Sequence, residues 1–195
     1  DTPLSLTGVK MLPIMEIDGE ILNESLQIIK KLDKNNLLKT QDFLSSLPSS
    51  SDDSPKEVAQ AQIDAEKRLH LINLLDKLGK SIHSLAMPYW IFTPEFSENS
   101  RLYFQHKKEK KRGPFKDLLR NRAEFEKQLQ SDLVEAEKDL TPHYQSSDLT
   151  LLDLLLASHL WGMYVVPEFQ FSEKIHQYLQ DIKKRCQFHY LENDR

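Results

Sequence analysis

The chain has 195 residues, 39% of them hydrophobic and 29% charged, which is enough apolar material for one good core or for a small core beside a larger one. Its formal net charge of -4 and its pI near 6.0 argue against general nucleic-acid binding, for which a basic domain is expected. The single cysteine, Cys186, excludes an intramolecular disulfide framework and fits a reducing, cytoplasmic environment.

The sequence begins at Asp1 with no initiator methionine, so we expect that an upstream segment has been removed or left out. No signal peptide is visible. The longest apolar stretch, Leu149 to Val166, carries Asp153 and His159 and is at the short end of what a membrane span needs. It predicts a buried core helix, and no membrane partner is expected.

The stretch from Val9 to Asp33 predicts a hairpin followed by a helix. Leu12 to Ile17 is predicted to form a strand that begins at an X-Pro bond. Asp18-Gly19 is predicted to form the tight turn to a second strand at Ile21-Leu22. Asn23 is the expected N-cap of the helix, and Glu24 suits its first turn, where negative charge offsets the dipole.

Residues 36–55 predict a linker, because serine, aspartate and proline replace any apolar period in LPSSSDDSP. The sequence beyond this linker is predicted to be helical. Ser54 is the expected N-cap of a long helix that reaches Pro88, and further helices are expected at about 98–112, 115–140 and 172–186. Thr150-Leu151-Leu152-Asp153 has the form of a capping box at the head of the apolar helix, which gives Asp153 a structural task.

Two of these segments resemble the type-2 glutaredoxins, which are built like glutathione S-transferases. The first is the hairpin with its following helix. Asp1-Thr2-Pro3, then Thr7-Gly8-Val9-Lys10, looks like the loop that precedes the corresponding strand in that family. The second is the pattern YF..KKE...G.F.DLL over 103–119. The capping box that begins at Thr150 is also similar to one that glutathione-transferase-like helical domains carry. The resemblance covers nearly the whole chain, apart from an extended linker around Leu44 to Asp53.

The resemblance implies a mainly α (α+β) fold. An incomplete thioredoxin-like hairpin and helix would occupy residues 1–35, and an all-α domain of the glutathione-transferase C-terminal type would occupy 56–195, after the 36–55 linker. About forty residues with a Cys-Pro-Tyr-Cys motif normally come before this part of the family's chain, and the present sequence holds none of them. We therefore expect no catalytic residue here.

The resemblance also implies a glutathione site at Leu12, Pro13, Glu24 and Ser25. A cis bond before Pro13 would turn the backbone of Leu12 toward the cysteinyl unit of glutathione. The Ser25 amide and hydroxyl, at a helix N-terminus, would suit the γ-glutamyl carboxylate, and Glu24 could pair with the amine. An ordinary hairpin with a capped helix is the structural alternative.

Three functions follow as alternatives. The first is a glutathione-dependent disulfide oxidoreductase without its redox-active dithiol, a monomer whose partners are glutathione and glutathionylated or disulfide-containing proteins. The second is a glutathione S-transferase-like conjugating enzyme. The third is a non-catalytic interaction module that uses the helical domain, with the basic stretch Lys107 to Arg112 as its contact.

Other chemistries find little support. The seven histidines are scattered without ligand spacing or a nearby cysteine, so no metal is expected. Only five glycines are present and no phosphate loop or nucleophile elbow is found. The basic stretch Lys107 to Arg112 suits a phosphate or acidic partner, or simply a solvated helix end. Cys186, near a helix C-terminus, is expected to be a structural or incidental thiol.

Overall fold

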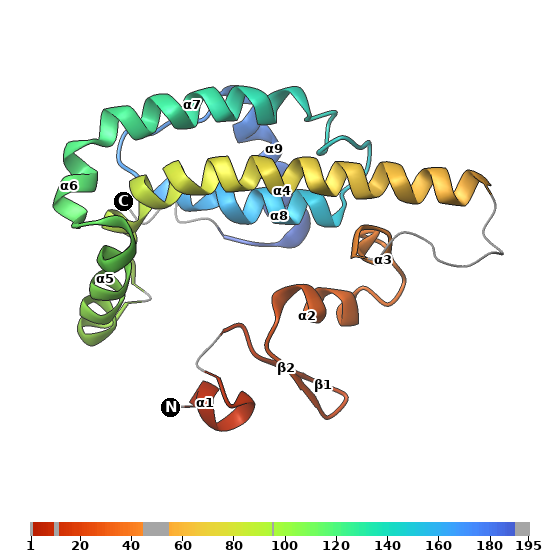
Figure 1. Ribbon diagram of the computed structural model, residues 1–195, viewed down its shortest axis with the longest axis horizontal. Helices are drawn as coiled ribbons and strands as arrows, with labels where there is room; N and C mark the ends of the chain where they lie inside the picture. The colour runs from red at the N-terminus through yellow and green to blue at the C-terminus, as the bar shows by residue number, and fades with distance from the viewer. Residues whose placement is uncertain (1, 10–11, 45–54, 95, 190–195) are drawn as a thin grey trace. The chain divides into compact units, whose positions relative to one another are not determined.

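The computed structural model describes residues 2–9, 12–44, 55–94 and 96–189. The chain divides into two compact units, residues 1–66 and residues 67–195. The first unit contains a two-stranded antiparallel sheet with short helices, and the second is helical (Figure 1). The predicted α+β fold class, mainly helical with a hairpin ahead of a helical domain, is confirmed.

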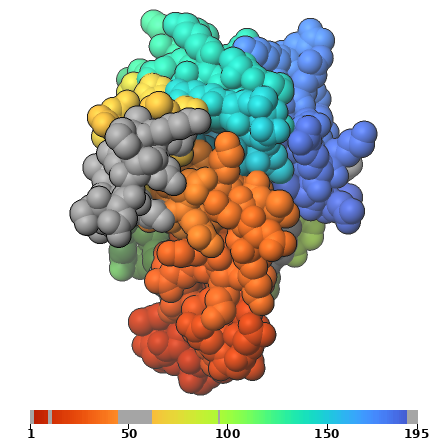
Figure 2. Space-filling view, turned by 90° about the vertical axis from the view of Figure 1, so that its right-hand side faces the viewer, coloured from red at the N-terminus to blue at the C-terminus, as the bar shows by residue number. Residues whose placement is uncertain are grey.

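The first unit is built from five short elements. They are α1 (Thr2–Thr7), β1 (Met15–Ile17), β2 (Glu20–Leu22), α2 (Ser25–Leu32) and α3 (Thr40–Leu44). Figure 2 shows the surface of this part of the chain in red and orange. The prediction of a loop before Lys10 is wrong over residues 2–7, where the chain forms α1. This helix ends at Thr7, and the next residue, Gly8, has a φ of +71°, a conformation that glycine adopts readily.

The hairpin forms where the sequence predicts it. Asp18 and Gly19 both have positive φ, at 53° and 81°, which is the backbone that a two-residue turn needs to match the twist of its strands. The strands themselves are shorter than predicted. β1 begins at Met15 rather than at Leu12, so residues 12–14 lead into the sheet without belonging to it.

A buried carboxylate ends α2 and organises the chain that follows. Asp33 accepts hydrogen bonds from the amides of Leu37 at 2.7 Å and Leu38 at 3.1 Å. Burial alone would raise the pKa of this carboxyl group, but hydrogen bonds from Thr40 and from the amides of 37, 38 and 40 outweigh it and lower the pKa. The predicted linker segment therefore contains an ordered turn leading into α3.

The second unit continues from the last part of a long helix. Its elements are α4 (Pro55–Trp90), α5 (Glu98–Arg112), α6 (Phe115–Arg120), α7 (Arg122–Lys138), α8 (Leu151–Leu160), the 3-10 helix η1 (Trp161–Val165) and α9 (Glu173–Cys186). Pro88 lies inside α4 rather than after it, and the predicted cap at Ser54 lies outside the described residues.

The core of this unit is made by leucines that helical spacing places on facing sides. Side chains with no measurable exposure come from α4, α7, α8 and α9, namely Leu71, Leu78, Leu129, Leu151, Leu156, Leu160 and Leu179. A second apolar cluster joins the end of α4 to α5, α6 and α7 through Met87, Ile91, Phe115, Leu118, Trp90, Phe104 and Phe125. Burial of these side chains is the main source of stability.

Two predicted helices are interrupted. The helix expected over 115–140 is broken at Asn121, because α6 buries Phe115 and Leu118 while α7 turns Leu129 and Leu133 to a different part of the core. The helix expected to reach Val166 tightens into η1 after Leu160, ahead of Pro167, which cannot donate a backbone hydrogen bond. In the described part of the chain, no helix is both long and apolar enough to cross a membrane.

Candidate functional site

Leu12 and Pro13 lie at the entry to the hairpin and are open to solvent. The peptide bond between them is cis. Leu12 is 72% exposed, although it is a large apolar side chain, and Pro13 is exposed as well. The chain thus presents apolar surface and backbone at this entry rather than burying them.

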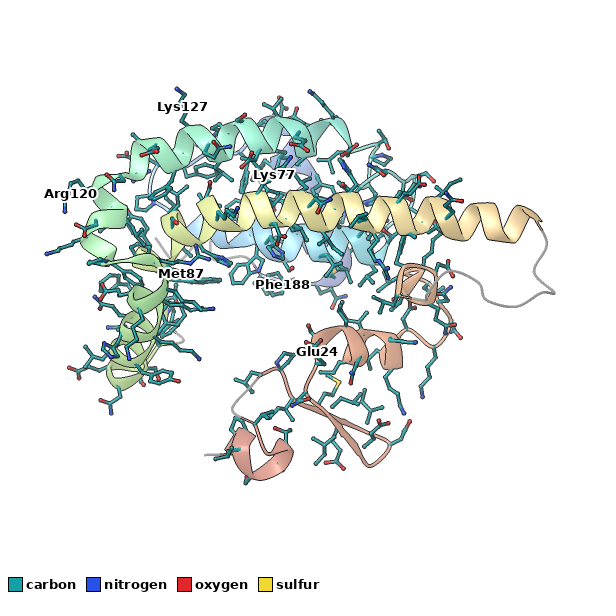
Figure 3. The ribbon with its side chains drawn as sticks, in the orientation of Figure 1. Glu24, Lys77, Met87, Arg120, Lys127 and Phe188 are labelled. Atoms are coloured by element: carbon teal, nitrogen blue, oxygen red, sulfur yellow. The ribbon has the colours of Figure 1, made fainter. Side chains whose placement is uncertain are left out.

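Glu24 lies at the head of α2 (Figure 3). Ser25 is the first residue of this helix, and here the predicted cap needs correction. The N-cap is Glu24 rather than Asn23, because Glu24 has extended backbone (φ -117°, ψ 120°) and its carbonyl accepts the first helical hydrogen bond, from Ile28 at 2.9 Å. Glu24 makes no side-chain cap bond, so its carboxylate stays available at the surface. The amides of Ser25 and the two following residues precede that first bond and point out of the helix end.

The register of the hairpin brings these two pairs to one end. Met15 pairs with Leu22 and Glu16 with Ile21. The ladder ends at the Met15–Leu22 pair, so Leu12 and Pro13 precede this open end by two or three residues and Glu24 and Ser25 follow it by two or three. The entry to the hairpin and the positive end of the α2 dipole thus both adjoin the open end of the hairpin.

Cys186, the one thiol of the chain, ends α9 in the other unit and is exposed. Its pKa is raised, first by partial burial and further by the carboxylate of Asp181, with Arg185 opposing the shift. A thiol of raised pKa is almost entirely protonated at neutral pH, and the thiolate is the reactive form. This agrees with the interpretation of Cys186 as an incidental thiol.

The basic stretch Lys107 to Arg112 forms the last turn and a half of α5, where its cations offset the helix dipole. Glu109 is used locally, because its carboxylate accepts the amide of Phe115 at 2.8 Å and so holds the start of α6. Arg112 points back to α4, where its Nη2 lies 3.0 Å from Nδ1 of His83. Nothing in the sequence signals this contact between residues 29 positions apart.

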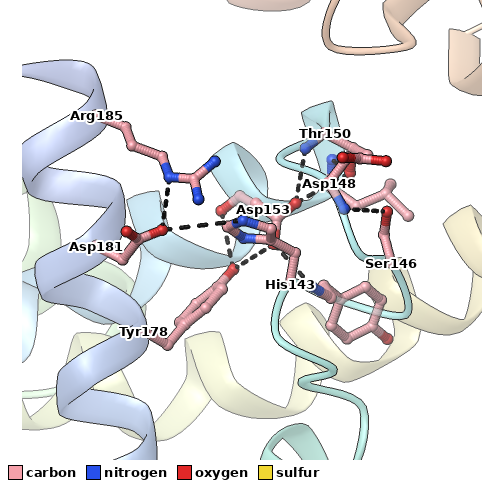
Figure 4. Close-up of polar contacts among 10 residues, drawn as sticks. His143, Ser146, Asp148, Thr150, Asp153, Tyr178, Asp181 and Arg185 are labelled. Carbon is pink, nitrogen blue, oxygen red and sulfur yellow. Dashed lines mark hydrogen bonds and ion pairs between the residues drawn. The ribbon is translucent and has the colours of Figure 1, made fainter.

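The capping box at the head of α8 is confirmed, and it is larger than predicted (Figure 4). The Asp153 carboxylate is fully buried and accepts the Thr150 amide at 2.8 Å. It also accepts the Tyr144 amide at 2.7 Å and the Tyr178 hydroxyl at 3.0 Å, two partners that the sequence did not reveal. Asp153 thus joins α8, the preceding loop and α9, and its role is structural.

His143 lies beside this network and is 2% exposed. Its Nδ1 is 3.6 Å from a carboxylate oxygen of Asp153, and its Nε2 is 3.9 Å from one of Asp181. Neither ring nitrogen is within hydrogen-bond distance of a partner among the described residues. In the same part of the chain, no three histidine, cysteine or carboxylate side chains gather as metal ligands.

Comparisons with known proteins agree with this architecture. Residues 70–194 match the family described as "Glutaredoxin 2, C terminal domain". Among solved structures, the chain is similar to the crystal structure of glutaredoxin 2 (grxB) from Salmonella typhimurium in complex with glutathione, with a TM-score of 0.75 and 23% identity, over 98% of this chain and 80% of that one. At this identity the likeness shows the fold. No curated protein matches the chain.

Proposed function

Since the chain belongs to the glutaredoxin 2 family, we propose that it is part of a glutathione-dependent thiol-disulfide oxidoreductase and that its first unit supplies one side of the glutathione site. The observation that supports this proposal is the hairpin itself, whose open end adjoins both the cis Leu12-Pro13 bond and the head of α2 with Glu24 and Ser25. The similar Salmonella structure, which contains glutathione, supports the same ligand.

Each proposed contact uses a group whose chemistry fits one part of the tripeptide. The γ-glutamyl carboxylate of glutathione would accept the Ser25 amide and hydroxyl, where the dipole of α2 favours negative charge. The Glu24 carboxylate would pair with the glutathione ammonium group. The exposed backbone at Leu12 would bind the cysteinyl unit as an added strand does.

The attacking thiol lies outside this arrangement. Exchange with a glutathione mixed disulfide requires a thiolate that attacks one sulfur while the other leaves. The 195 residues hold a single cysteine, in the other unit and with a raised pKa. We infer that these residues contribute glutathione binding, as a monomer in a reducing cytoplasm, with glutathionylated or disulfide-containing proteins as partners.

Truncating the two polar side chains at the head of α2 should weaken glutathione binding. In calorimetric titrations, we expect the Glu24→Ala, Ser25→Ala double variant to bind glutathione at least about tenfold more weakly than the wild type, because it loses an ion pair and a charge-assisted hydrogen bond. Both side chains are exposed, so the fold should be unaffected.

The matched control is Glu16→Ala, which removes the same charge from exposed β1 and should leave the affinity unchanged. Equal affinities for the double variant and the wild type would overturn the site assignment. A wild type that gives no binding heat would show that these residues do not hold glutathione by themselves.

We also expect no disulfide exchange from these residues. The reduction of a mixed disulfide between glutathione and a small thiol, followed through coupled NADPH oxidation by glutathione reductase, should proceed at the rate of glutathione alone. Cys186→Ser should not alter that rate, because the Cys186 thiol is protonated at neutral pH. An acceleration by the wild type that disappears in Cys186→Ser would contradict this and make Cys186 a nucleophile.

A further inference from the structure

A cavity of about 550 Å³ in the helical unit is lined by cations and hydroxyl groups. Its walls come from α4, the end of α5 and α7, and its lining residues are Lys80, Ser81, Ser84, Arg112, Glu124, Phe125, Lys127, Gln128 and Ser131. The volume lies within the range of small-molecule sites, roughly 300–1,000 Å³. The cavity shares no residue with the proposed glutathione site.

The cations of this cavity are near one lining carboxylate, Glu124, but are not paired with it. Among the described residues, Lys80, Arg112 and Lys127 form no ion pair with an aspartate or glutamate. Lys77, less than one turn from Lys80 on the same helix, pairs with Glu135 at 2.9 Å. Lys127 stands at the rim, with its side chain running outward from α7 (Figure 3). Lys80 and Arg112 are therefore the two cations best placed for a ligand.

Arg112 is held in a fixed direction by a neutral histidine. Its Nη2 lies 3.0 Å from Nδ1 of His83, and the Arg112 side chain is partly buried. Burial lowers the pKa of His83 to about 4, and the nearby charges of Arg112, His159 and Lys108 add to the effect. His83 is thus uncharged at neutral pH and accepts one Arg112 hydrogen bond, which leaves the rest of the guanidinium fork free.

The surroundings of Arg112 carry an excess of positive charge. The pKa of Lys108 is lowered, first by burial and then by repulsion from Lys107, Arg112 and Lys111. An anion bound here would relieve that repulsion. The buried hydroxyl of Ser81 lies in the same cavity, and the Phe125 ring supplies an apolar wall. Ser84 also lines the cavity, but its hydroxyl donates to the Lys80 carbonyl oxygen at 2.8 Å.

We propose that this cavity binds a small phosphorylated molecule, with the phosphate between Lys80 and Arg112 and the organic part against Phe125. A guanidinium fork with a second cation matches a phosphate dianion, which carries more charge than a single carboxylate. A concave site of this volume suits a small molecule such as a nucleotide better than it suits the flat surface of a partner protein. Glu124 also lines the cavity and opposes an anion, so it sets a limit on the affinity.

The test uses adenosine 5'-monophosphate and inorganic pyrophosphate as probes, titrated by calorimetry into the full chain. We expect saturable binding at one site, with adenosine alone inactive. Arg112→Gln and Lys80→Gln should each weaken binding about tenfold, while Glu124→Gln should tighten it about threefold. Lys184→Gln, at an exposed position of α9, removes the same charge away from the cavity and should change nothing.

Circular dichroism melting shows whether each variant is folded. If Arg112→Gln is destabilised, Lys80→Gln still tests the proposal, because Lys80 is exposed and makes no ion pair with a described carboxylate. An absence of saturable binding would overturn the proposal. Equal weakening by Lys184→Gln would also overturn it, because the effect would then depend on net charge alone. Binding of adenosine as tight as that of its monophosphate would overturn it as well.

Discussion

Replacing Asp153 with alanine should lower the free energy of unfolding of the helical unit by about 4 kcal/mol, because the partners of a buried carboxylate lose their acceptor. The Asp153 carboxylate accepts the amides of Thr150 and Tyr144 and the hydroxyl of Tyr178. In the alanine variant these donors stay buried without a partner, and the head of α8 loses its cap. Ordinary capping substitutions cost only about 1 kcal/mol, so a larger loss would reflect the wider network.

Equilibrium unfolding in urea at 25 °C, followed by circular dichroism, measures this difference. Asp148→Ala is the matched control, because Asp148 lies five residues away in an exposed position and should cost less than about 0.5 kcal/mol. A loss below about 1 kcal/mol for Asp153→Ala would mean that water replaces the carboxylate and that the network contributes little.

Acid should destabilise the helical unit through His83. The folded pKa of His83 is about 4, and its value in the unfolded chain is 6.5, so between these values the unfolded state binds more protons. The contribution of neutral His83 to the free energy of unfolding is therefore fully present above pH 6.5 and falls as the pH drops toward 4. The full shift would correspond to about 3.4 kcal/mol, and solvent screening of this partly buried group reduces the expected loss to about 2 kcal/mol.

The measurement is the free energy of unfolding at several values between pH 7.5 and pH 4.5, for the wild type and for His83→Gln. Glutamine can still accept the Arg112 hydrogen bond but does not titrate, so the variant should show a flatter profile in this range. His106→Gln, an exposed histidine on α5, should retain the wild-type slope. Parallel profiles for wild type and His83→Gln would rule out His83 as the acid-sensitive group.

Local chemistry explains which elements the sequence predicted. The Asp18-Gly19 turn and the Thr150 to Asp153 box are each determined within four consecutive residues, the turn by backbone preference and the box by reciprocal side-chain bonds, and both appear where expected. The cap of α2 is one residue later than predicted. Asn23 is the better capping side chain, but the hairpin keeps the chain extended through Glu24. Tertiary structure here outweighed intrinsic preference.

Contacts between distant residues could not be predicted in the same way. The break between α6 and α7 at Asn121 follows from two helices burying different faces, although the leucine spacing alone suits one continuous helix. The contact between Arg112 and His83, and the hydrogen bond from Tyr178 of α9 to Asp153, depend on how helices pack after folding. For the proposed glutathione site, the sequence named the residues through resemblance, and they adjoin the open end of the hairpin in the structure.

The lone cysteine offers a practical advantage. Because Cys186 is the one thiol in the chain and is exposed at the end of α9, a maleimide dye should attach at a single position without prior mutagenesis. Its raised pKa makes labelling slow at neutral pH and faster under mildly alkaline conditions, which permits control of stoichiometry. A fluorophore placed there would report on ligand titrations in the helical unit at concentrations far below those that calorimetry requires.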